Sequence, residues 1–212
     1  MIGSSDGELL QAWQGGEASA GQTLVTRHLE SVHRFFSNKV RDSTEDLVQQ
    51  TFLACLESAD RFEGRASFRA YLFGIARNLL YRHYREHTKG FDPLTSSTHV
   101  MMVEQRSPAD AMAEQEEQRL LLRGLQRLPL DLQTLLELAY WESLSDQELS
   151  EVLELPVGTV KSRLRKARSE LDALLGTVSG DAELLGSTRH TLNSWAEKAG
   201  LGLAPAEPGT RR

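Results

Sequence analysis

The chain has 212 residues, of which 40% are hydrophobic and 25% are charged, and its formal net charge is −6. These values are ordinary for a globular protein. Cys55 is the single cysteine, which excludes an intramolecular disulfide. No apolar run approaches the ~18 residues of a membrane span, and the first residues lack the features of a signal peptide. We therefore expect a cytoplasmic protein that does not insert into membranes.

The charges are distributed unevenly along the chain. Between Arg61 and Lys89 there are seven basic residues against two acidic ones, and between Gly158 and Glu170 there are five against one. The intervening stretch from Glu104 to Arg119 holds five acids against two bases. Because binding to DNA depends on the local field at the contact surface, an acidic total does not exclude it. The pattern predicts two DNA-facing modules separated by an acidic linker.

The N-terminal part shows the periodicity of helices with one buried face. Apolar residues recur every three or four positions from Val25 to Phe36, and again from Leu47 to Leu56 after a helix start near Ser43. A third helix begins at about Ser67, with one apolar side. That side consists of Phe68, Leu72, Ile75, Leu79 and His83. No alternating strand pattern is present, so we expect an all-helical bundle of about 90 residues.

The helical pattern stops between Gly90 and Ala109, where prolines and a Ser/Thr cluster indicate a linker. It resumes at Leu120 and ends near Leu175. We predict an all-α protein of two helical modules joined by a flexible linker. The expected boundaries are residues 1–90 for the first module, 91–113 for the linker, 114–176 for the second module and 177–212 for a C-terminal extension of unknown role.

A helix-turn-helix is predicted between Leu144 and Leu175. Ser145 with Glu148 forms a capping-box pattern that starts a short helix, and Pro156 separates it from a second helix. Opposite the apolar stripe of the second helix lie hydroxyl and cationic side chains. These are Thr159, Lys161, Ser162, Arg165, Lys166 and Ser169. A basic solvated face is common on helices, but a capped helix, a tight turn and a basic second helix together favour contact with DNA in the major groove.

The helix from Ser67 carries a second candidate nucleic-acid surface. Opposite its apolar side, aromatic residues alternate with arginines and one asparagine. These are Phe73, Arg77, Asn78, Tyr81, Tyr84 and Arg85. Rings and guanidinium groups suit stacking on unpaired bases and pairing with phosphates. Packing of these rings against neighbouring helices is the alternative interpretation.

Two runs of residues resemble bacterial sigma factors of the extracytoplasmic-function type, the smallest members of the sigma-70 family. The run from Leu144 to Leu164, with Pro-Val-Gly-Thr-Val-Lys-Ser-Arg-Leu at its end, resembles region 4.2, and Leu125–Trp141 looks like region 4.1. Glu154 and Ser143 depart from the pattern, because glycine is usual at both positions. The resemblance implies that the second helix reads the −35 element through Thr159, Lys161, Ser162, Arg163, Arg165 and Lys166.

The N-terminal module resembles region 2 of the same family. Glu45–Phe52 looks like region 2.2, which implies contact with core RNA polymerase through Asp46, Gln49, Gln50 and Phe52. Phe68–Leu79 looks like regions 2.3 and 2.4, which melt and read the −10 element, and Tyr71 stands where tryptophan is frequent. The residues implied in binding the melted strand are Phe62, Arg65, Ser67, Tyr71, Phe73, Arg77, Asn78, Tyr81 and Arg85.

The resemblance implies a sigma factor whose partners are core RNA polymerase, promoter DNA and an anti-sigma protein. The alternative is a stand-alone helix-turn-helix regulator that uses the N-terminal module for dimerisation or ligand sensing. An enzyme is not expected, since no phosphate-binding loop, zinc pattern or nucleophile elbow occurs. We expect no cofactor and no metal, because His83 and His87 are four residues apart but lack a third ligand in the sequence.

Overall fold

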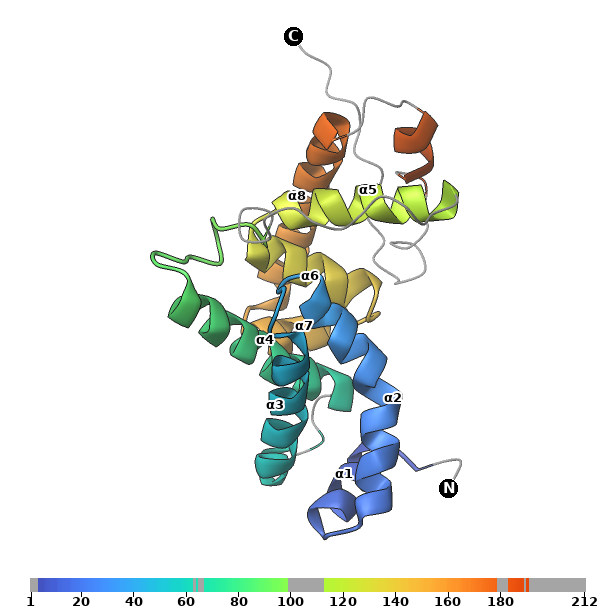
Figure 1. The fold of residues 1–212 in the computed structure, drawn as a ribbon, viewed down its shortest axis with the longest axis vertical. Coiled ribbons are helices and arrows are strands. Elements are labelled where there is room, and N and C mark those ends of the chain that lie inside the picture. The colour runs from blue at the N-terminus through green and yellow to red at the C-terminus, as the bar shows by residue number, and fades with distance from the viewer. Residues whose placement is uncertain are drawn as a thin grey trace. The chain divides into compact units, whose positions relative to one another are not determined.

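The computed structural model describes residues 4–62, 64, 67–98, 113–178, 183–188 and 190, with the side chains of residues 61 and 113–115 left out. These residues form helices and no strand, which confirms the predicted all-α fold (Figure 1). The helices are α1 (Asp6–Gln14), α2 (Ala18–Ser37), α3 (Thr44–Glu57), η1 (Ala59–Arg61), α4 (Phe68–His87), α5 (Ala113–Arg127), α6 (Leu130–Tyr140), α7 (Asp146–Leu153) and α8 (Val157–Val178). None of the described helices is long and apolar enough to cross a membrane.

The chain divides into two compact units. The first contains Met1–Pro93 and Gln147–Pro156, and the second contains Leu94–Asp146 and Val157–Arg212. The helix-turn-helix is therefore shared, because α7 lies in the first unit and α8 in the second.

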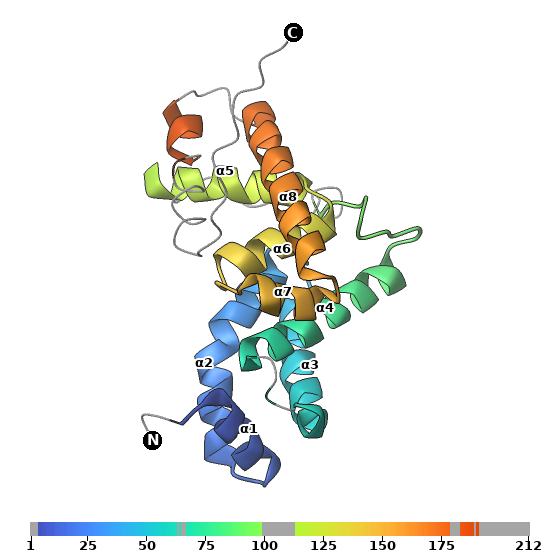
Figure 2. The ribbon, with the colours of Figure 1, turned by 180° about the vertical axis from the view of Figure 1, so that it is seen from behind.

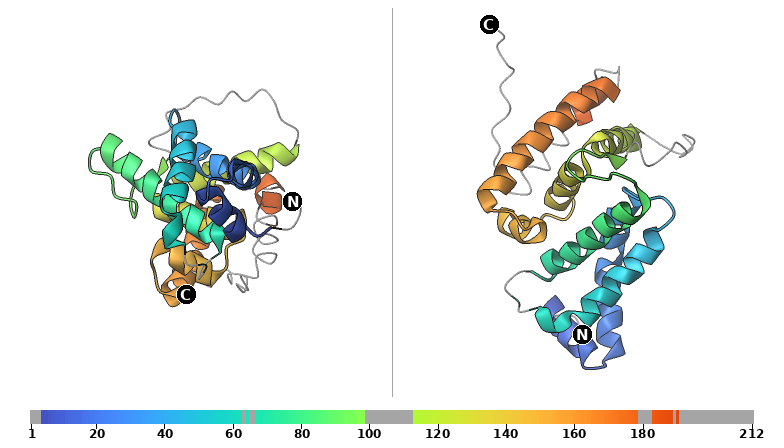
Figure 3. Two further views of the ribbon diagram at one scale, coloured as in Figure 1. Left: turned by 90° about the horizontal axis from the view of Figure 1, so that it is seen from below. Right: turned by 90° about the vertical axis from the view of Figure 1, so that its left-hand side faces the viewer.

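In the first unit, α1 to α4 enclose a core of aromatic and aliphatic side chains. Helix α2 packs on α1 and α3, and α3 packs on α4 (Figure 3). Phe35 makes edge contacts with Phe36 and with Phe73, whose ring centroid is 5.6 Å away. All three rings are buried, so this cluster connects α2 to α4. Burying rings of this size contributes on the order of 2–3 kcal/mol each.

Helix α4 buries a wider face than its sequence pattern predicts. Phe73 and Tyr84 were expected on the side opposite the core, but both are buried, and the Tyr84 hydroxyl donates a hydrogen bond to the carbonyl oxygen of Lys39. Ile75 and His83, which were expected on the buried side, are only partly covered. A helix with neighbours on two sides buries more than one stripe, which a single periodicity does not reveal.

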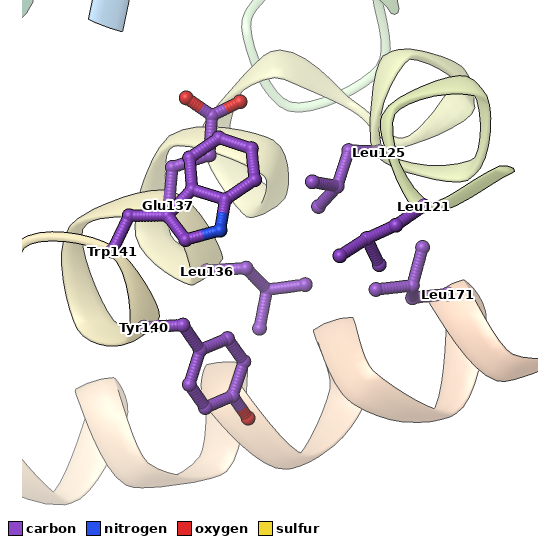
Figure 4. Close-up of a pocket in the computed structure, with 7 residues that line it drawn as sticks. All are labelled: Leu121, Leu125, Leu136, Glu137, Tyr140, Trp141 and Leu171. Atoms are coloured by element: carbon purple, nitrogen blue, oxygen red, sulfur yellow. The ribbon is translucent and has the colours of Figure 1, made fainter. Parts of the chain in front are cut away.

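The second unit is built on the packing of α5 and α6 against α8, and α5 crosses α8 (Figure 2). A Cβ atom added to Gly124 would lie 2.9 Å from side-chain atoms of Leu171 and Leu175, so glycine permits the close approach of α5 and α8. The side chains between these helices leave one small pocket, lined mainly by leucines and two aromatic residues (Figure 4). Its volume of about 10 Å³ is no larger than a single water molecule requires.

The start of the expected linker belongs to the second unit. The Leu130 amide donates to the carbonyl oxygen of Ser96 (2.8 Å). The hydroxyl of Thr98, which is fully buried, donates to Gln133 Oε1 (2.9 Å), and Gln133 Nε2 donates to Glu137 Oε1 (2.8 Å). A short helical segment at residues 183–188 also joins this unit, where the Ser187 hydroxyl donates to Glu117. The sequence also predicts a short amphipathic helix at residues 192–199, which lies outside the described residues.

Two residues adjoining α7 have backbone conformations that favour glycine. Ser143 has φ = 51° and Glu154 has φ = 55°, and they are the only non-glycine residues with positive φ in the described part of the chain. These are the two positions at which the sequence departs from the glycines of the sigma pattern. A non-glycine residue with positive φ costs on the order of 1–3 kcal/mol.

We expect Glu154→Gly to stabilise the protein by about 1 kcal/mol, because relief of strain exceeds the entropy that glycine loses on folding. The expected rise in Tm is about 2–4 °C, measured by thermal denaturation followed by circular dichroism. The matched control is Glu151→Gly inside α7, which should destabilise by about 1 kcal/mol. A lower Tm for Glu154→Gly would show that the positive φ carries no strain.

Candidate nucleic-acid and polymerase interfaces

The predicted −35 face lies on the exposed side of α8. Burial of the stripe from Val160 to Leu175 leaves polar and cationic side chains pointing away from the core. Lys161, Ser162, Arg165 and Lys166 are exposed, and Thr159 is half-buried. Lys161 pairs with Asp146 at 3.5 Å and Lys166 with Glu170 at 3.6 Å, both near the surface. Exposed pairs of this kind contribute little stability, so both ammonium groups can exchange their carboxylate for a phosphate.

Arg163 does not lie on this face. Its guanidinium donates to Asp131 Oδ2 at 2.5 Å, and this carboxylate at the start of α6 is buried. The ion pair holds α8 against α6. It also occupies the Arg163 guanidinium, which is the group that would have to contact a phosphate or a base edge. This arrangement does not favour the prediction that Arg163 contacts DNA, and we expect Arg163 to support the face of α8 instead. The sequence could not reveal this, since Asp131 lies 32 residues earlier.

The outer side of α4 carries the second predicted surface. The guanidinium of Arg77 lies over the Tyr81 ring, 4.7 Å from its centroid, and both side chains are half-buried. Asn78 and Arg85 are exposed on the same helix. Phe73 is 0% exposed, so its ring is unavailable for stacking on a base, contrary to the prediction. Arg77 Nη1 also donates to the carbonyl oxygen of Val152 (3.4 Å), which holds this cation–aromatic pair in place, and an amide and a second guanidinium lie on the same helix.

The segment before α4 gathers three aromatic rings. Phe62 lies 5.2 Å from Tyr71 and 6.0 Å from Phe68, measured between ring centroids. The Tyr71 hydroxyl donates to the carbonyl oxygen of Ser58 (2.8 Å), so the phenol of this tyrosine is held internally. Phe62 and Tyr71 are both half-buried. Phe62 thus keeps part of its ring accessible while its neighbours fix its position.

Two further predicted residues border this segment. The Ser67 side chain accepts a hydrogen bond from the Ala70 amide (3.2 Å), and Ser67 is therefore the N-cap of α4. Such a cap typically contributes about 1 kcal/mol to helix stability. Arg65 lies outside the described residues.

The exposed face of α3 carries the predicted polymerase contact. Asp46, Gln49 and Gln50 are exposed, as predicted residues of an interface should be. Phe52 is buried in the core and does not share this face. The prediction for Phe52, which came from the resemblance to region 2.2, is corrected, because this ring packs in the core.

Leu53 is a surface residue that the sequence reasoning missed. Its side chain is 52% exposed, and at 100° per residue it lies at the middle of the sector that includes Asp46, Gln49, Gln50 and Glu57. The edges of this sector are marked by His33, 3.9 Å from Glu45, and by Arg82, which donates to Gln50 (3.1 Å). A leucine at the centre of a polar ring resembles the anchor of a protein interface. The signal was a lone apolar residue on a polar helix face.

Nothing in the described part of the chain forms a group of three potential metal ligands. His83 and His87 stack with centroids 4.4 Å apart, and burial together with the neighbouring His87 lowers the pKa of His83. Burial raises the pKa of the Cys55 thiol to about 12, which makes this cysteine a packing residue rather than a nucleophile.

Comparison with known proteins identifies both modules. The family described as Sigma-70 region 2 matches residues 24–90, and the one described as Sigma-70, region 4 matches residues 118–171. The chain belongs to the sigma-70 family. The curated relatives place this sigma factor in the extracytoplasmic-function type. One is an ECF RNA polymerase sigma-E factor of Haemophilus influenzae, 29% identical over 182 residues that cover 79% of this chain and 94% of the relative.

Other relatives agree with this assignment. An RNA polymerase sigma-H factor of Pseudomonas aeruginosa is 29% identical, with 80% of this chain and 93% of the relative covered. The solved structure of CnrH in complex with the cytosolic domain of CnrY is 26% identical to this sigma factor. It has a TM-score of 0.62 and covers 83% of this chain and 100% of CnrH. The fold also resembles the sigma factor RpoE in a complex with the anti-sigma factor NepR from Bartonella quintana, with a TM-score of 0.56.

Arg163 and Arg165 of α8 should behave differently when substituted. Arg163→Ala should lower the free energy of unfolding by about 1–2 kcal/mol, because the buried Asp131 loses a charged hydrogen-bond donor. Arg165→Ala should change stability by less than about 0.5 kcal/mol but reduce the slope of log K against log salt for −35 duplex by about 1.

Urea denaturation and fluorescence anisotropy at several salt concentrations measure the two effects. If Arg163→Ala left stability unchanged and reduced the salt slope, Arg163 would be a phosphate ligand, as the sequence pattern predicted.

Proposed function

We propose that this sigma factor binds core RNA polymerase through the exposed face of α3 and directs it to a two-part promoter. The observation that carries the proposal is the presence of both sigma modules, in order, each with an exposed polar face of the kind its role needs. The proposed dependence on polymerase also fits the acidic charge of the chain. A protein of net charge −6 binds free DNA weakly until polymerase adds its own basic surfaces. The chain acts in the cytoplasm, where polymerase and promoters are, and it does not itself catalyse a reaction.

The −35 element is read as duplex by α8. Thr159, Lys161, Ser162, Arg165 and Lys166 lie in the first half of the helix, which is the end that a recognition helix inserts into the major groove. The cations hold phosphates, and the hydroxyl groups and Arg165 are within reach of base edges in this orientation. Arg163 supports the face through Asp131.

The −10 element is read as a separated strand by the outer side of α4 and the segment before it. Phe62 and the Arg77–Tyr81 pair offer faces for stacking, worth about 1–3 kcal/mol per base. Asn78 and Arg85 offer an amide and a cation to base edges and phosphates. Unstacking of the bases costs a few kcal/mol, and these contacts together with polymerase binding supply it.

Control by an anti-sigma protein is part of the proposal. CnrH is described in complex with the cytosolic domain of CnrY, and the likeness to CnrH covers most of this chain. An anti-sigma protein that covers the α3 face would block polymerase by direct competition. The segment at 183–188 and the rest of the C-terminal extension are candidates for assisting that control, so a chain ending at Leu175 should differ from the full chain in transcription.

The first test is co-purification with core RNA polymerase and run-off transcription from a candidate promoter. Leu53→Ala should weaken polymerase binding about 10-fold or more, because it removes the apolar centre of the α3 face. Asp46→Ala should weaken it as well, by loss of a charge at the edge of the same face. Leu29→Ala is the matched control, since Leu29 is also exposed (45%) but lies on α2.

The proposal would be supported by promoter-specific transcripts together with polymerase binding that is weakened by Leu53→Ala and Asp46→Ala but not by Leu29→Ala. A chain that binds duplex DNA alone and shows no affinity for polymerase would instead be a stand-alone helix-turn-helix regulator. Equal binding by Leu53→Ala and Leu29→Ala would remove Leu53 from the interface while leaving the sigma assignment intact.

A further inference from the structure

The helix α1 precedes the residues matched by Sigma-70 region 2, which begin at 24, and its role is not explained by that match. It starts with a capping box, in which the Ser5 side chain accepts from the Glu8 amide (3.3 Å) and Glu8 accepts from the Ser5 amide (2.7 Å). Leu9 and Leu10 are buried. Helix α1 is therefore capped and packed into the core of the first unit.

One side of α1 is attached to α2 at both ends. Asp6 binds the Arg27 guanidinium and also His28 Nε2, which lies 2.8 Å from its second oxygen. Seven residues later, Trp13 lies directly over Gly21, where an added Cβ would be 2.4 Å from the indole nitrogen. Only glycine allows this approach. Because residues seven apart share a helix face, Asp6 and Trp13 define one side of α1.

The adjacent side of α1 contacts the segment that leads to Phe62. A Cβ added to Gly7 would be 3.4 Å from Cε1 of the Phe62 ring, so the backbone of α1 lies beside this ring. Gln14, again seven residues later, donates from Nε2 to Asp60 Oδ1. Helix α1 thus has α2 on one side and the residues from Asp60 to Phe62 on the other (Figure 1 shows α1 beside α2).

We propose that α1 is a positioning element for promoter melting, which holds Phe62 in place through Gly7 and Gln14 while Asp6 and Trp13 fix the helix to α2. The inference rests on the proposed function, because it concerns the ring assigned to the separated −10 strand. A ring with fixed neighbours loses less conformational freedom when a base stacks on it than a mobile ring does. Phe68 and Tyr71 of α4 contact the ring, and α1 completes the support from residues N-terminal to it.

The test uses the full chain with core RNA polymerase and a promoter that carries 2-aminopurine in the −10 element, whose fluorescence rises as the base leaves the stack. Gln14→Ala should slow this rise about 3- to 10-fold through loss of the hydrogen bond to Asp60. Gln11→Ala is the matched control, because Gln11 is exposed on the same helix. Affinity for polymerase should be unchanged in both variants.

A double-mutant cycle separates positioning from a general structural role. If α1 acts through Phe62, Gln14→Ala should have no further effect in the Phe62→Ala background. Gly21→Ala, which displaces Trp13, should reproduce the slow melting without involving the Gln14 hydrogen bond. Wild-type rates for Gln14→Ala, or an undiminished effect in the Phe62→Ala background, would overturn the proposal. A wild-type chain that does not bind polymerase would overturn the proposed function itself, which is a distinct result.

Discussion

Burial of the apolar stripes of α8 and α3 is the constraint on which the proposed −35 and polymerase faces depend. In α8, the stripe from Val160 to Leu175 can be covered only if the opposite side faces outward, so Lys161, Arg165 and Lys166 are exposed. The same constraint on α3 places Asp46 and Leu53 outside. The core thus determines which residues can reach a partner.

A second layer of organisation comes from polar groups that are buried with their partners. Arg163 and Asp131 join α8 to α6, and Thr98, Gln133 and Glu137 form a hydrogen-bonded chain along α6. A buried polar group without a partner costs about 1–3 kcal/mol, so each of these contacts selects one arrangement of its helices over others. Apolar packing alone would tolerate small rotations of α8, which would turn its cationic face.

Much of the fold and part of the site could be predicted from the sequence. Helical periodicity, capping residues and Pro156 located the helices from α2 to α8, and the motif resemblance identified the family. The errors have a common cause, since periodicity describes a helix in isolation. Phe73 is buried because α4 has neighbours on two sides, and Arg163 is engaged by a residue distant in the sequence. The contacts of α1 with Phe62 depend on tertiary structure in the same way.

The segment from Leu94 to Thr98 shows that the end of a helical pattern is not the boundary of a folding unit. A fragment that begins with α5 at Ala113 would lack Thr98, and the buried Gln133 Oε1 would lose its hydroxyl donor. A chimaera that exchanges the −35 module between related sigma factors should therefore be joined after Pro93, so that the segment Leu94–Thr98 stays with its own α6. A chimaera joined at Ala113 would combine the segment Leu94–Thr98 of one parent with the α6 of the other. The buried hydrogen bond from Thr98 to Gln133 would then join residues of two parents, so folding would change together with promoter specificity.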